Sequence, residues 1–272
     1  MYVVKMGGAA CVSTDAICAD LAAMHQVGQQ VVLIHGGSDE TNRLADALGH
    51  PPRFVTSVSG HTSRVTDART LEIFVMATAA INRRLVAGLQ AAGLPAIGLS
   101  GIDGRLIEAR RKEVIRVVED GRQRVIRDDW TGTPTGINVA LLHTLLHAGY
   151  LPVLAPLAIS PAGEMLNIDG DRGAAALAGA LGAEALVLLT NVPGLLRAYP
   201  DEQTLIRHIT RSDLDEVAGV AAGRMRKKLL GAAEALDAGV PRVMIADGRI
   251  AHPVRAALSG EGTTIETERI GP

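Results

Sequence analysis

Short runs of consecutive apolar residues alternate along the chain with longer stretches in which apolar residues recur every three or four positions. The short runs predict buried strands, and the longer stretches predict amphipathic helices. The predicted strands cover residues 2–6, 31–35, 95–99, 151–155, 185–190 and 242–245, and the predicted helices cover residues 15–27, 39–48, 67–92, 138–148, 171–181 and 225–238. Strands that alternate with helices indicate an α/β fold with a mainly parallel sheet between helices.

The period changes between residues 114 and 127. Two strand-like runs, 114–119 and 122–127, flank Asp120-Gly121, a dipeptide typical of a two-residue β-hairpin turn. We therefore predict an antiparallel hairpin attached to the parallel sheet. No repeat and no clear linker divides the chain, so we expect a single domain over residues 1–272, with an N-lobe of about residues 1–165 and a C-lobe of about residues 166–272.

Composition narrows the class of protein. Hydrophobic residues make up 47% of the 272 positions and aromatic residues only 2%, so the core must be aliphatic, as in parallel strands buried on both faces. A net charge of −2 supplies no overall basic field for nucleic acid or a membrane surface. Cys11 and Cys18 are spaced for a helix rather than for a metal site, which favours reduced thiols and a cytoplasmic location. Neither a signal segment nor an apolar run of 18 residues is seen.

Lysine is scarce and stands beside glycine turns. The chain has 27 lysine and arginine residues, of which only those at positions 5, 112, 227 and 228 are lysine. Lys5 precedes Gly7-Gly8 at the end of the first predicted strand, and Gly36-Gly37 follows the second. Paired glycines let backbone N–H groups approach an anion closely, so the two turns favour phosphate binding. No Gly-Lys-Ser/Thr occurs, which excludes a P-loop, and the spacing of glycines 98–104 does not fit a dinucleotide fingerprint.

Further polar residues stand at the borders of predicted elements. The segment from Asn167 to Asp171 has an Asn or Asp at every second position before an Ala-rich helix. One helix N-cap needs only one of them, so an aspartate is left to orient Lys5 and Lys228. Arg64 precedes the long helix and could clamp a carboxylate, and Thr190 ends a buried strand where a nucleotide edge would fit; a solvated arginine and a plain turn stay open as readings.

Taken together, these motifs resemble the amino acid kinase family over nearly the whole chain and in the same order. The resembling segments are Lys5-x-Gly7-Gly8, His35-Gly36-Gly37, Ser63–Asp67, Asn167-x-Asp169-x-Asp171 and Met225-x-x-Lys228. Within the family, the chain is similar to the N-acetylglutamate kinase branch, and most similar to the kinases that act on 2-aminoadipate linked to a LysW-type carrier protein. One difference is Asp169, where N-acetylglutamate kinases usually have Asn.

The resemblance implies a three-layer αβα sandwich, a homodimer, and use of ATP with Mg²⁺ held mainly by the phosphates rather than by protein ligands. It implies that Lys5 and Lys228 stabilise the transferring phosphoryl group and that Asp171 organises both lysines. The acceptor substrate would be held by Gly36, Gly37, Arg64 and Asn167. Phosphate would be cradled by Gly7 and Gly8, and Thr190 would lie near the nucleotide. The N-lobe would bind the acceptor and the C-lobe ATP.

The implied reaction is phosphorylation of the side-chain carboxylate of carrier-bound 2-aminoadipate to an acyl phosphate, in lysine biosynthesis. A carboxylate with a pKa near ~4.3 is already ionised at neutral pH, so no general base is required. An N-acetylglutamate kinase of arginine biosynthesis, or a kinase for LysW-linked glutamate, remains an alternative. A non-catalytic amino-acid sensor on the same fold is an alternative of another class.

A basic strip predicts where the carrier docks. Residues 105–127 contain eight basic and four acidic side chains, a local balance of +4. Because the carrier implied by the resemblance is acidic, we expect Arg110, Arg111 and Lys112 to take part in its docking. A solvated hairpin with cross-strand ion pairs is the other reading of this strip.

Overall fold

The computed structural model describes residues 1–9, 11–58, 60, 62–119, 122–214, 216–217 and 223–267. Its main sheet is parallel apart from two strands at one edge: β16 pairs antiparallel with β15, and β14 runs parallel to β16. In these ranges its eight strands, in spatial order, are β14 (His208–Thr210), β16 (Thr263–Glu266), β15 (Arg242–Asp247), β13 (Ala185–Thr190), β1 (Tyr2–Met6), β2 (Val31–His35), β10 (Leu151–Ala155) and β5 (Ala96–Ser100). The predicted α/β class with a mainly parallel sheet is therefore confirmed.

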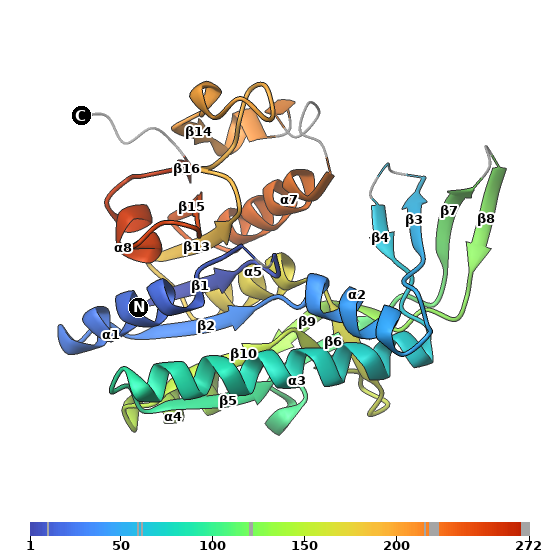
Figure 1. Ribbon diagram of the computed structural model, residues 1–272, viewed down its shortest axis with the longest axis horizontal. Helices are drawn as coiled ribbons and strands as arrows, with labels where there is room; N and C mark the ends of the chain where they lie inside the picture. The colour runs from blue at the N-terminus through green and yellow to red at the C-terminus, as the bar shows by residue number, and fades with distance from the viewer. Residues whose placement is uncertain are drawn as a thin grey trace.

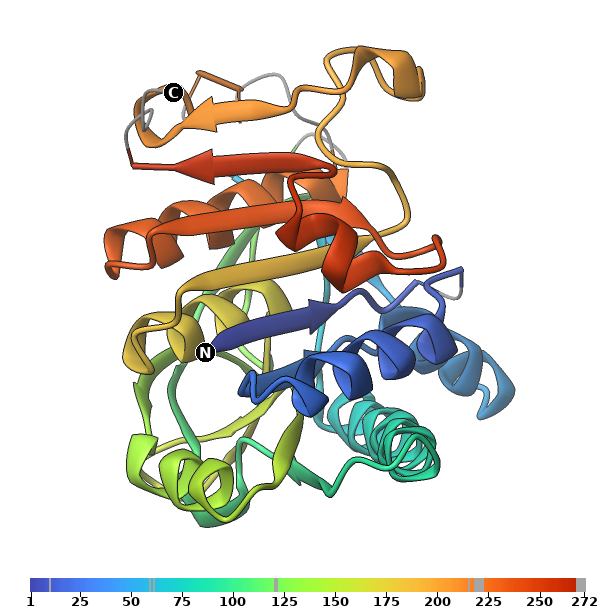
Figure 2. The ribbon, with the colours of Figure 1, turned by 90° about the vertical axis from the view of Figure 1, so that its left-hand side faces the viewer.

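Helices cover both faces of this sheet, which gives three layers (Figures 1 and 2). One face carries α1 (Thr14–Gln26), α3 (Ala68–Ala91) and α8 (Pro253–Leu258), and the other carries α4 (Val139–His147), α5 (Gly170–Ala180) and α7 (Gly223–Asp237). Successive residues of a strand point to opposite faces. Accordingly Val3 belongs to one buried aliphatic cluster and Val4 to the other.

Helix α2 (Ser38–Ala47) packs beside α3, and two smaller sheets complete the fold. One sheet of four short strands closes on itself: β11 (Leu157–Ile159), β12 (Met165–Ile168), β9 (Thr131–Ile137) and β6 (Ile107–Arg111). The other is β4 (Thr62–Arg64), β3 (Phe54–Ser57), β7 (Ile115–Glu119) and β8 (Arg122–Ile126), which projects from the body as an arm near α2 (Figure 1). Single 3₁₀ turns lie at Asp103–Arg105, Glu202–Thr204 and Arg211–Asp213.

The predicted hairpin is present. Strands β7 and β8 pair antiparallel, with Glu119 opposite Arg122. The turn itself, Asp120-Gly121, lies outside the described residues. The two lobes expected around residue 165 stay a prediction, and no described helix has the length and apolar character needed to cross a bilayer.

Candidate active site

Three neighbouring strands of the main sheet end together. Strand β1 lies between β13 and β2, and Met6 is opposite both Leu189 and His35. The residues that follow these strands, Gly7 and Gly36, therefore meet at one edge of the sheet, next to the Thr190 end of β13. Ligands of open parallel sheets collect at this carboxyl edge.

The two glycine turns touch backbone to backbone. A Cβ atom added to Gly8 would lie 2.8 Å from the amide nitrogens of Gly37 and Ser38, and one added to Gly36 would lie 2.7 Å from the nitrogen of Gly8. Only glycine fits such an approach, because real Cβ atoms essentially never come within 3.0 Å of another heavy atom. The two turns therefore lie together, with the amide nitrogens of Gly8, Gly37 and Ser38 in one small region.

Two lysines share one buried carboxylate beside these turns. The Nζ of Lys5 lies 2.9 Å from Oδ1 of Asp171, and the Nζ of Lys228 lies 3.2 Å from Oδ2. The exposed fractions of Lys5, Asp171 and Lys228 are only 6%, 7% and 7%. Segments at the beginning, middle and end of the chain therefore converge on one cluster with a net charge of +1.

Local sequence explains how each member reaches the cluster. Asp171 lies in the first turn of α5, whose N-cap is Asp169; the Asp169 carboxylate accepts hydrogen bonds from the amides of Asp171 and Arg172. Helix α7 approaches α5 closely because Gly231 has no side chain: an added Cβ would lie 3.1 Å from the backbone of Asp171. One turn before Gly231, Lys228 faces the same way and reaches the carboxylate.

The cluster perturbs the ionisation of its members. Burial alone would raise the pKa of Asp171, but Lys228 and Lys5 together hold it well below its usual value, so the carboxylate stays ionised. Burial and the neighbouring Lys5 lower the pKa of Lys228 to about 8, because two ammonium groups share one counter-ion. Positive charge held in a buried position next to the glycine turns is suited to stabilising an anionic transition state.

The residues predicted to bind the acceptor form a connected group. The guanidinium of Arg64 donates a hydrogen bond to the carbonyl of Ser38, 3.0 Å away, directly after Gly37. The side-chain amide of Asn167 donates to the hydroxyl of Thr66, 3.1 Å away. Arg64 is thereby fixed against the second glycine turn, and Asn167 is fixed against the segment that contains Arg64.

Sequence reasoning missed the group that holds Thr66. Asp129 is 1% exposed, and its carboxylate accepts hydrogen bonds from the amides of Thr66 and Thr131. The amide of Trp130 donates to the carbonyl of Thr66 in turn. Arg111 stacks on the Trp130 ring at 3.6 Å from its centroid. A single buried Asp in a predicted loop gives little signal in a sequence, so this group was not predicted.

Asn82 was missed as well. It lies on the buried face of α3, and its side-chain amide contacts the Nε2 of His35 and donates to the carbonyls of Leu99 and Val153. The Nδ1 of His35 lies 3.0 Å from the carbonyl of Gly36 and must therefore donate its proton. Burial lowers the pKa of His35 to about 4, so the ring is neutral near pH 7. A polar residue at position 82, within the apolar stripe of the long helix, was the available signal.

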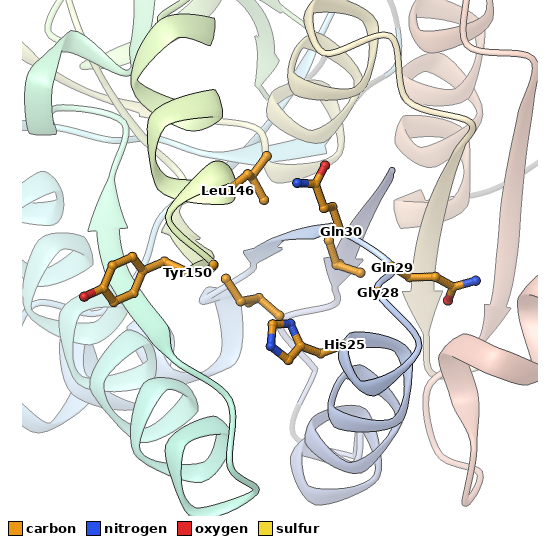
Figure 3. Close-up of a pocket in the computed structure, with 9 residues that line it drawn as sticks. His25, Gly28, Gln29, Gln30, Leu146 and Tyr150 are labelled. Atoms are coloured by element: carbon orange, nitrogen blue, oxygen red, sulfur yellow. The ribbon is translucent and has the colours of Figure 1, made fainter.

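The described residues contain no group of three or more His, Cys, Asp or Glu side chains that could hold a metal ion. A pocket lined by residues that include His25, Gln30, Leu146 and Tyr150 lies at the amino ends of β2 and β10, at the opposite edge of the sheet from the lysine cluster (Figure 3). The chemistry-bearing residues do not line it.

Comparisons with known proteins agree with this geometry. Residues 1–247 match the model of the amino acid kinase family. The chain is 55% identical to a [LysW]-aminoadipate kinase of Deinococcus radiodurans, over 97% of this chain and 91% of that protein, and 53% identical to a [LysW]-aminoadipate kinase of Thermus thermophilus, over 97% and 100%. Among solved structures, the N-acetylglutamate synthase of Neisseria gonorrhoeae matches with a TM-score of 0.80 and 29% identity over 99% of this chain; this chain spans only 60% of that synthase. The chain belongs to the amino acid kinase family.

Proposed function

We propose that this protein transfers the γ-phosphoryl group of ATP to the side-chain carboxylate of 2-aminoadipate linked to a LysW-type carrier protein. The observation that carries the proposal is the buried Lys5–Asp171–Lys228 cluster beside two touching glycine turns. The near full-length similarity to two [LysW]-aminoadipate kinases supports the choice of acceptor.

In the proposed reaction an oxygen of the acceptor carboxylate attacks the γ-phosphorus. A new O–P bond forms, the bond from phosphorus to the β-phosphate oxygen breaks, and ADP leaves with the electron pair. The nucleophile is already ionised near pH 7, so the chain need not remove a proton. Lys5 and Lys228 neutralise charge on the phosphoryl oxygens during transfer, and Asp171 keeps both ammonium groups aimed at one point.

The glycine cradle fits an ATP phosphate chain, because the amide nitrogens of Gly8, Gly37 and Ser38 lie close together; the amides of Gly7 and Gly36 donate to backbone carbonyls instead. In this proposal Mg²⁺ arrives with ATP, held mainly by phosphate oxygens, and neutralises part of their charge. Asp171 is already engaged by two lysines, and Asp169 caps α5. Thr190, at the end of β13, would lie near the nucleotide.

The acceptor would lie on the N-lobe side, between Gly36-Gly37, Arg64 and Asn167, with ATP on the C-lobe side. Arg64 suits the α-carboxylate, since a guanidinium binds carboxylates through two parallel hydrogen bonds. Asn167 suits the amide that joins the amino acid to its carrier. A homodimer in the cytoplasm completes the proposal.

The arm offers a surface for the carrier. In β4, Arg64 pairs with Phe54 of β3, so their side chains lie on one face of the arm. Val118 of β7 pairs with Thr56 and shares this face. Phe54 is 51% and Val118 40% exposed, so apolar surface continues outward from the acceptor-binding arginine. A globular carrier that presents its substrate to Arg64 would cover this face.

The basic strip expected from the sequence divides into parts with different surroundings. Arg111 belongs to the fold: besides stacking on Trp130, it donates to the Asp129 carbonyl and pairs with Glu164 at 3.1 Å. Arg116 and Arg122 are exposed on the arm. Docking of the carrier on basic residues stays a prediction, and the arm arginines probe it better than Arg111, whose reversal would disturb folding.

The experiment that tests the proposal measures ADP release from ATP with carrier-bound 2-aminoadipate and with N-acetylglutamate, and traps the acyl phosphate with hydroxylamine. Turnover should require an acceptor and favour the carrier-bound one. Lys5→Ala and Lys228→Ala should each lose most of kcat, whereas Lys227→Ala, the neighbour on α7, should be much milder. Preference for N-acetylglutamate would support the alternative kinase, and no acyl phosphate with any acceptor would support a sensor.

A further inference from the structure

All four lysines of the chain gather around the beginning of α5. Lys5 and Lys228 bind Asp171 directly. Lys112 interacts electrostatically with Asp169 and with Lys227, although it is 57 residues or more away from both in sequence. Arg172, in the first turn of α5, adds a further positive charge to this region. The cluster of Lys5, Asp171 and Lys228 gives no role to Lys112.

Lys112 stands on the acceptor side of this site. It follows β6 directly, and its amide donates to the carbonyl of Thr131, 2.9 Å away. Thr131 in β9 is in turn opposite Asn167 of β12. The sheet therefore places Lys112 across one strand from Asn167, next to the Asp129 group that fixes Thr66.

The positive charge of Lys112 is balanced only in part by the protein, through Asp129 and Asp169. Among the described residues Lys112 makes no salt bridge, whereas Arg111 before it is paired with Glu164. The Asp129 carboxylate nearby already accepts hydrogen bonds from two backbone amides, and Asp169 is engaged in capping α5. The side chain of Lys112 is exposed on one side, yet burial of the ammonium, with repulsion from Arg172 and Lys227, lowers its pKa. An anion bound here would relieve that repulsion.

We infer that Lys112 binds a carboxylate of the acceptor and contributes to its recognition. The inference rests on the proposed function, because it assumes an acceptor held beside Asn167. The carboxylate comes either from the amino acid itself or from the carrier residue to which the amino acid is linked. Lys112 thus departs from the role expected for it in the basic strip: it faces the substrate rather than a docking surface.

The test compares Lys112→Met, which keeps the length of the side chain and removes its charge, with Arg207→Met as the control. Arg207 is an exposed residue directly before β14, at the edge of the main sheet, and its substitution also removes one positive charge. Both variants are checked for unchanged melting temperature, and Lys112→Arg, which keeps the charge, should restore most of the affinity. For each protein, kcat, the acceptor KM and the ATP KM are measured with carrier-bound 2-aminoadipate and with N-acetyl-2-aminoadipate.

Lys112→Met should raise the acceptor KM roughly tenfold to a hundredfold, the loss expected for a hydrogen bond to a charged group, and leave the ATP KM nearly unchanged. A rise with both acceptors assigns the carboxylate to the amino acid, and a rise with the carrier-bound acceptor alone assigns it to the carrier. An acceptor KM equal to that of Arg207→Met, or a fall in kcat alone, overturns the inference. Calorimetric dissociation constants of the same acceptors, measured without turnover, report on Lys112 even if wild-type protein is inactive and the proposed function fails.

Discussion

Replacing Asp171 by Asn removes the counter-ion of two buried lysines with almost no change in volume. Loss of one partner from a buried ion pair costs about 3–5 kcal/mol of the free energy of unfolding. The cost for each lysine also has an upper limit, because that lysine can lose its proton instead. From the ordinary lysine pKa of 10.5, deprotonation at pH 7 costs about 5 kcal/mol, at about 1.4 kcal/mol for each unit. We therefore expect the variant to lose about 3–5 kcal/mol at pH 7.

This upper limit on the loss of stability depends on pH, and it falls as pH rises. A lysine whose pKa is lower in the folded than in the unfolded protein destabilises the fold most at low pH, and the destabilisation disappears as pH rises toward 10.5. At pH 9 the same limit is only about 2 kcal/mol. The difference in stability between Asp171→Asn and wild type should therefore shrink as pH rises from 7 to 9.

Urea unfolding at pH 7, 8 and 9 measures this difference. Asp169→Asn is the control: it makes the same chemical change two residues earlier, at the N-cap of α5, where Asn caps about as well as Asp, so it should cost under about 1 kcal/mol. In the same preparations, kcat of Asp171→Asn should fall about a hundredfold to a thousandfold, the range seen when one transition-state donor is lost. A stability difference that matches the control, or that is independent of pH, would refute the view that Asp171 holds two charged lysines.

Three further outcomes are expected. The value of kcat/KM for ATP should fall as pH rises through about 8, because Lys228 loses its proton there, and residual activity of Lys228→Arg should lack this fall. Arg64→Ala and Asn167→Ala should raise the acceptor KM about tenfold or more and change the ATP KM little; the opposite pattern would assign both residues to ATP. Gly231→Ala should lower kcat several-fold by pushing α7 away from Asp171. Its thermal stability should stay near that of wild type, because alanine favours the helix by about 1 kcal/mol. An unchanged kcat would show that the two helices accommodate the added methyl group without displacing Asp171.

Six of the eight described strands of the main sheet could be predicted from the sequence because their signals are local; the short edge strands β14 and β16 were missed. The run Val31–Ile34 is apolar, and all of Val31–His35 is buried. The long helix predicted from residue 67 is α3, whose N-cap is Asp67. The small closed sheet was missed, since β9 contains Thr, Gly and Pro, residues that weaken strand prediction, and is held by pairing with β6 and β12. Long-range pairing of this kind leaves little trace in local periodicity.

In the candidate site, too, some features could be predicted from the sequence and others could not. Lys5, Asp171 and Lys228 could be named because each stands at the border of an element and belongs to a family motif. Their arrangement around one carboxylate requires the fold, as does the surrounding of Lys112. In the sequence, Lys112 follows two arginines and reads as part of a basic strip. Only the register of β6, β9 and β12 places it across from Asn167.

The contact between Gly8 and Gly36 couples two loops, to which the proposed function assigns the ATP phosphates and the acceptor. Neither backbone can move toward the other without displacing it, because the two already lie closer than any side chain would permit. A substrate that settles one loop therefore also settles the loop that receives its co-substrate. By reciprocity, each substrate should tighten binding of the other by the same factor, so the order in which they arrive would not matter to the stability of the ternary complex.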